Sequence, residues 1–135
     1  MGASGVSWDE DDGALDWVQE YETDGLGAIT RAFDAALEAE DGAYLDGDIG
    51  AAVIAAAQYV AAARDGDHAL LETHPPVTAE IAEHPNLDGL AARALAALAR
   101  ILDEDASELF DLWNENDALF GAWSAGIDAL QARLS

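Results

Sequence analysis

The sequence predicts an all-α fold, a compact single-domain bundle of six or seven helices spanning residues 1–135. Apolar residues recur at spacings of three and four along most of the chain, which is the period of an α-helix. No run of β-branched residues alternates with polar ones, so no strand is expected. Alanine, the strongest helix former, occurs 31 times.

Two helices are expected in the N-terminal third, behind an arm of residues 1–12 that packs on the bundle. The first helix begins near Asp12, and the second follows an N-cap at Asp24 and ends near Asp41-Gly42. Their apolar stripes have helical spacing: Leu15, Val18 and Tyr21 in the first helix, then Leu26, Ile29, Phe33 and Leu37 in the second.

A third helix is predicted between an N-cap at Asp48 and a stop at Asp65-Gly66. Its apolar stretch, residues 51–63, is too short for a membrane span, which needs about 20 residues. We therefore expect a buried helix. Its stripe consists of Ile49, Val53, Ala56 or Ala57, and Val60.

Proline-containing breaks at residues 73–76 and 84–86 flank a short helix with Val77 and Ile81. A strong helix then runs from Leu87 to about Asp103. Two more helices follow, the first opened by Asp105 and Glu108 as an acidic analogue of the capping box, the second after a break at residues 114–116. Their apolar positions are Leu109, Leu112 and Trp113, then Leu119, Trp123, Ile127, Leu130 and Leu134.

The charge is strongly one-sided. The chain has 28 Asp and Glu residues against five arginines and no lysine, for a net charge of −23. Such a surface repels nucleic acid and anionic membranes, so neither is expected as a partner. Half of the residues are apolar and the acids are spread along the chain, which argues against disorder. The composition favours adaptation to a salt-rich cytoplasm, where molar salt screens charges beyond about 3 Å.

Several kinds of catalytic and metal-binding site need residues that this sequence does not contain. Without cysteine there is no disulfide, thiolate metal site or cysteine nucleophile, and without lysine there is no phosphate-binding P-loop. Glu80 and His84 miss the Glu-x-x-His spacing of di-metal bundles by one residue, and the loop at residues 46–50 lacks the later EF-hand ligands. No metal and no cofactor is expected. Residues 1–6 do not resemble a signal peptide, so a cytoplasmic location is expected.

The four tryptophans suggest the candidate binding surface. Trp113 and Trp123 fall on apolar stripes and are predicted to be core. The other two flank an acidic run, and together they form an aromatic and acidic set that can grip a cation or an arginine-bearing partner: Trp8, Asp11, Asp12, Asp16 and Trp17. In the alternative interpretation, Trp8 pins the N-terminal arm to the bundle and Asp12 caps the first helix.

The same N-terminal residues carry a family resemblance. The segment from Met1 to Trp17, with Trp8, Asp11-Asp12 and Asp16, resembles the signature of the "domain of unknown function 4259" family, and the alanine-rich residues 51–57 are similar to its middle helix. The sequence departs from that signature at Ser4 and Gly13. The resemblance implies a small helical prokaryotic protein and lends no activity. Its acidic character is similar to that of immunity-type proteins that neutralise toxins, which is an analogy only.

The leading functional hypothesis is therefore a small, acidic, non-enzymatic protein-binding module whose partner and oligomeric state the sequence leaves open. A carboxylate-based hydrolase is the first alternative, and it requires a deep pocket lined by at least two buried Asp or Glu residues. The second alternative is a protein that binds a small ligand or cation at the N-terminal acidic run.

Overall fold

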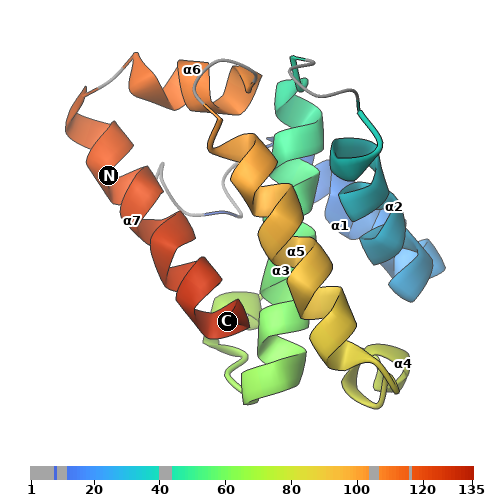
Figure 1. The fold of residues 1–135 in the computed structure, drawn as a ribbon. Helices are drawn as coiled ribbons and strands as arrows, with labels where there is room; N and C mark the ends of the chain where they lie inside the picture. The colour runs from blue at the N-terminus through green and yellow to red at the C-terminus, as the bar shows by residue number, and fades with distance from the viewer. Residues whose placement is uncertain (1–7, 9–11, 40–43, 104–106, 116) are drawn as a thin grey trace.

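The computed structural model describes residues 8, 12–39, 44–103, 107–115 and 117–135. Among these residues it contains seven α-helices and no β-strand beyond an isolated bridge between Leu45 and Ser107, which confirms the predicted all-α class (Figure 1). The helices are α1 (Asp12–Asp24), α2 (Leu26–Leu37), α3 (Gly47–Asp65), α4 (Ala79–Ala82), α5 (Leu87–Ile101), α6 (Glu108–Asn114) and α7 (Asp117–Leu134), with a 3₁₀ turn, η3 (Ala69–Leu71).

Helix α3 is the centre of the bundle, and α1, α2, α5 and α7 all pack against it. Every residue from Val53 to Ala62 is buried, so the expectation of a buried helix is confirmed, but burial extends around the whole helix instead of along one stripe. A helix that is apolar on all sides needs neighbours on all sides. The alanines allow those neighbours to approach closely, because helix separation depends on the side chains at the contact.

Helices α1 and α2 are joined by a turn at Gly25, whose φ of 53° favours glycine over any other residue. Asp24 is the last residue of α1 and not the cap of α2, so that prediction is wrong, because the turn itself starts α2 at Leu26. The predicted α1 stripe is also shifted. Leu15 is exposed whereas Ala14 and Trp17 are buried, since the side of α1 that meets α2 and α3 includes Trp17.

The other helix boundaries follow local capping chemistry. Helix α3 is capped by Asp46, whose side chain accepts the Asp48 N–H at 2.8 Å, so the predicted cap at Asp48 is wrong by two residues. The predicted stop is confirmed by Gly66, which has a φ of 74°. Helix α6 is capped by Ser107, and Asp105 lies outside the described residues.

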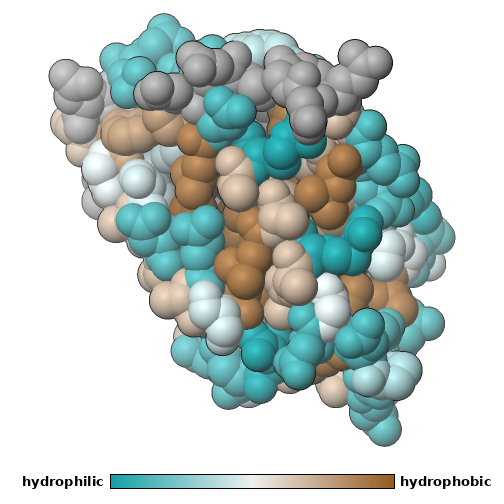
Figure 2. All heavy atoms as spheres, viewed as in Figure 1, coloured by the Kyte–Doolittle hydropathy of each residue, from teal (hydrophilic) through white to brown (hydrophobic). Residues whose placement is uncertain are grey.

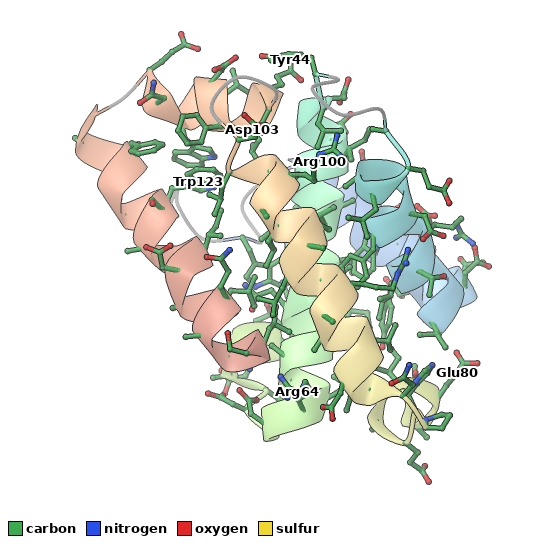
Figure 3. The ribbon with its side chains drawn as sticks, in the orientation of Figure 1. Tyr44, Arg64, Glu80, Arg100, Asp103 and Trp123 are labelled. Carbon is green, nitrogen blue, oxygen red and sulfur yellow. The ribbon has the colours of Figure 1, made fainter. Side chains whose placement is uncertain are left out.

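Two glutamates cap helices other than their own. Glu80 Oε1 accepts the Leu26 N–H at 3.2 Å at the start of α2, and Glu108 Oε1 accepts the Gly47 N–H at 2.6 Å at the start of α3. A carboxylate at a helix N-terminus satisfies free N–H groups and complements the helix dipole. Glu80, singled out above for its spacing to His84, thus has a structural role at the start of α2 (Figure 3).

A pair of tyrosines holds the proline-containing loop onto the bundle. Tyr21 of α1 and Tyr59 of α3 have ring centroids 4.3 Å apart. The Tyr21 hydroxyl donates to the Pro76 carbonyl at 2.8 Å and accepts the Thr78 N–H at 3.1 Å. The Tyr59 hydroxyl donates to the Pro75 carbonyl at 2.9 Å. The break in helical pattern at residues 73–76 is therefore a fixed part of the structure.

Each of the five arginines connects separate segments of the bundle. Arg64 and Arg100, labelled in Figure 3, donate to the backbone carbonyls of Leu134 and Ala39 respectively. The remaining three pair with carboxylates on other helices: Arg31 with Glu20 and Asp24, Arg93 with Asp34, and Arg133 with Asp65. The few positive charges of the chain are thus used as links between helices.

The pair between Arg133 and Asp65 gives a pH-dependent prediction. Hydrogen bonds from Arg133 lower the pKa of Asp65 from 3.8 to about 2. Because the folded-state pKa is depressed, the pair stabilises the fold at pH values above the ordinary pKa of the carboxyl. This contribution disappears as the pH falls from about 4 to about 2. We expect Arg133→Gln to return the Asp65 pKa towards 3.8, measured by NMR titration of the side-chain carboxyl. An unchanged titration would contradict the assigned cause.

Candidate functional site

The structure places the two N-terminal tryptophans in the core. Trp8 is 8% exposed, and its ring centroid lies 4.9 Å from that of His74. Trp17 is 4% exposed, stacks on Tyr21, and donates its indole N–H to the Ala28 carbonyl at 3.1 Å. Both rings therefore pack in the core, and the rest of the predicted arm, residues 1–7 and 9–11, lies outside the described residues.

Of the acidic members of the predicted set, only Asp16 has a side chain that the structure describes. Asp16 is exposed on α1, Asp11 lies outside the described residues, and Asp12 is the first residue of α1. The described residues thus bring together Asp16 and Trp17 only as neighbours in the chain. Of the two tryptophans predicted to be core, Trp123 is buried and Trp113 is half-buried beside it, with ring centroids 6.0 Å apart.

Within the described residues, a groove between α1 and α2 is the candidate for a functional site. Its volume is about 510 Å³, and it is open to solvent. The apolar part of the lining is Ala35, which is exposed, with the small exposed areas of the buried Trp17 and Ala32, and charged side chains form the other part. The lining residues are Trp17, Glu20, Arg31, Ala32, Asp34, Ala35 and Glu38.

Two of the carboxylates in this α1–α2 groove already have arginine partners. The Arg31 guanidinium donates to Glu20 at 2.7 and 3.0 Å and to Asp24 at 2.6 Å, and these carboxylates raise the pKa of Arg31. Asp34 pairs with Arg93 of α5. Both pairs are exposed, so they position the side chains more than they stabilise the fold.

Glu38 is the remaining carboxylate of the groove. It is exposed just after the last turn of α2, and its side chain makes no ion pair within the described parts of the chain. A negative charge at a helix C-terminus is unfavourable, because the helix dipole already places a partial negative charge there. The helix end and Glu38 together make this end of the groove attractive to a cation.

The described carboxylates lie at the surface of the protein. Each Asp and Glu whose side chain is described is at least partly exposed, whereas the hydrolase alternative required at least two buried ones. Within the same residues, no group of three or more His, Asp or Glu side chains is placed to hold a metal ion. An open groove with carboxylates and an apolar wall is suited to a ligand with a cationic end and an aliphatic stem.

A family model described as a domain of unknown function (DUF4259) matches residues 2–126. The chain belongs to the DUF4259 family. No curated protein and no solved structure matches it. The match covers the whole α1–α2 groove of this DUF4259 protein and confirms the family resemblance of the N-terminal segment. No described helix is both long and apolar enough to cross a membrane.

Most groove residues were absent from the predicted binding set, which contained only Trp17 of the seven. A signal for them exists in the sequence, because Arg31, Asp34 and Glu38 are spaced by three and four residues and so share the polar side of α2. The pairing of that side with Glu20 of α1 depends on the turn at Gly25, and this geometry is visible only in the fold.

Proposed function

We propose that this DUF4259 protein is a non-enzymatic binding module that takes an arginine- or lysine-bearing segment of a protein partner in the α1–α2 groove. The observation that carries the proposal is the groove itself, which combines an apolar wall with the unpaired carboxylate of Glu38 among the described residues. Long basic side chains fit such a groove, since their methylene stems cover apolar surface while the charged head reaches a carboxylate.

The charge of the chain supports the same class of partner. A net charge of −23 attracts basic surfaces and speeds their association. Orientation within the complex then depends on the groove, because long-range attraction carries little geometric information. Neutralisation of a basic toxin, as an immunity-type protein would do, is one form that such binding takes in this proposal.

A single-residue exchange tests the groove. We expect Glu38→Gln to weaken binding of an acetylated, amidated tetra-arginine peptide about tenfold, the loss of one charge-assisted hydrogen bond worth roughly 1.5 kcal/mol. Fluorescence anisotropy of the labelled peptide in molar potassium chloride measures this effect. At that salt concentration attraction beyond about 3 Å is screened, so the measurement reports contacts in the groove.

The matched control is Glu115→Gln, which removes the same charge from the exposed C-cap of α6, far from α2 in Figure 1. That variant should bind the tetra-arginine peptide with unchanged affinity. A tetra-citrulline peptide, which lacks the positive charge, should not bind. Equal weakening in both variants would mean that the peptide responds to general acidity and would refute the groove as the site. Glu38→Gln should also raise the free energy of unfolding by about 0.3–1 kcal/mol, because it removes the unfavourable charge at the end of α2.

A further inference from the structure

The charge of this chain is unevenly distributed over its helices. Helix α5 contains Asp88, Arg93 and Arg100, and α7 contains Asp117, Asp128 and Arg133. These two helices are therefore neutral together, and the rest of the chain carries the entire net charge of −23. A neutral pair of long helices in so acidic a chain needs an explanation beyond salt adaptation, which favours acids on every exposed surface.

The outward side of these helices consists largely of small residues. Figure 2 shows apolar residues running down α5 and along the seam between α5 and α7, with hydrophilic residues at the flanks. A Cβ added at Gly121 or Gly126 would meet nothing within 4 Å, so the outer side of α7 is open. The exposed small residues are Ala92, Ala96 and Ala99 of α5, with Ala118, Gly121, Ala122, Ala125, Gly126, Ala129 and Ala132 of α7. We call this surface the α5–α7 face.

We propose that the α5–α7 face is the contact between two copies of this chain. A second copy carries the same charge of −23, so the acidic surfaces repel it, and the neutral face is where two copies meet at the least electrostatic cost. A basic partner would gain no attraction from this face and would be drawn to the acidic helices. Small side chains also let the helices of two copies approach closely, and a two-fold symmetric contact pairs the same face with itself.

This contact is independent of the proposed function. The α1–α2 groove lies on helices that are away from α7 in Figure 1, and the pair between its Asp34 and Arg93 connects it to α5. Molar salt favours the dimer in two ways. It screens the repulsion between the remaining acidic surfaces of the two copies. A salt that is excluded from protein surfaces also makes the burial of apolar area more favourable.

The mass in solution tests the proposal. We expect sedimentation equilibrium in molar potassium chloride to show a dimer at a chain concentration of about 100 μM, and Ala125→Glu to raise the dimer dissociation constant at least about tenfold. The control Gln19→Glu adds the same charge at an exposed position of α1 and should leave the dimer intact. A monomeric wild-type chain, or a dimer that Ala125→Glu does not weaken, overturns the proposal.

A second measurement does not depend on disrupting the contact. The chain has no cysteine, so Ala125→Cys and Gln19→Cys each provide one labelling position. With nitroxide labels, pulsed dipolar spectroscopy should give a short, narrow distance between the two copies at position 125 and a longer one at position 19. A longer distance at position 125 than at position 19 would place the contact on another face and overturn the proposal.

Discussion

Replacing Tyr59 with alanine is expected to lower the free energy of unfolding by about 3–5 kcal/mol, the usual cost of removing a fully buried aromatic ring. Tyr59 has no exposed surface, and its ring centroid lies 4.3 Å from that of Tyr21 and 5.6 Å from that of Trp17. The three rings join α1 to the central helix α3. Loss of the Tyr59 ring would leave a cavity beside the rings of Tyr21 and Trp17, and surrounding side chains fill such cavities only in part.

Urea denaturation in molar potassium chloride, followed by circular dichroism, measures this loss and separates the ring from the hydroxyl. Tyr59→Phe keeps the ring and removes the hydrogen bond to the Pro75 carbonyl, at an expected cost of about 1 kcal/mol. Tyr21→Phe should cost more, because the Tyr21 hydroxyl both donates to Pro76 and accepts from Thr78. If Tyr59→Phe were as damaging as Tyr59→Ala, the ring packing would contribute little and this account of the core would be wrong.

Burial also raises the pKa of both tyrosines, and it is the largest cause of the increase for each. The hydroxyls therefore remain protonated over the range in which the fold is studied. They can donate to the two proline carbonyls at neutral pH and well above it. The link between the core and the loop at residues 73–76 is thus insensitive to pH, unlike the pair between Asp65 and Arg133.

The helices that could be predicted best from the sequence are those with one clear apolar side. Helix α5 was expected from Leu87 to about Asp103 and ends at Ile101. In α7 the predicted positions from Trp123 to Leu134 are buried. Spacing decides such helices because each packs on the bundle along one side only.

Two kinds of position were harder to predict: those where two nearby residues can both cap a helix, and those whose burial depends on which helix packs beside them. Asp46 and Asp48 both have side chains able to cap α3, and spacing alone does not choose between them. The buried side of α1 includes Trp17 instead of Leu15 because the turn at Gly25 places α2 against it. The α1–α2 groove was not predicted for the same reason, since apolar patterns locate the core and do not determine which polar sides meet.

The acidic exterior leads to the other large expected effect. Lowering potassium chloride from molar to about 10 mM is expected to reduce the free energy of unfolding by at least about 3 kcal/mol, which corresponds to a fall in Tm on the order of 10 °C for a chain of this size. The screening length grows from about 3 Å to about 30 Å over this range, so carboxylates on different helices begin to repel one another. A net charge of −23 makes that repulsion the dominant change.

The ion pairs of the arginines act in the opposite direction, since they become stronger when salt is removed. Their contribution to stability therefore decides whether the fold gains or loses stability at low salt. Removing salt strengthens ion pairs such as those of Arg31 and Arg93, but solvent-exposed pairs contribute little to stability, and the chain has only five arginines. Thermal melts by circular dichroism across the salt range measure the net effect. A variant with Asp16→Asn, Glu22→Gln and Glu83→Gln, three exposed acids, should keep its Tm to lower salt than the wild-type chain. If the wild-type Tm were the same at both ends of the range, repulsion between carboxylates would not limit the stability of this fold, and the prediction of salt adaptation would be wrong.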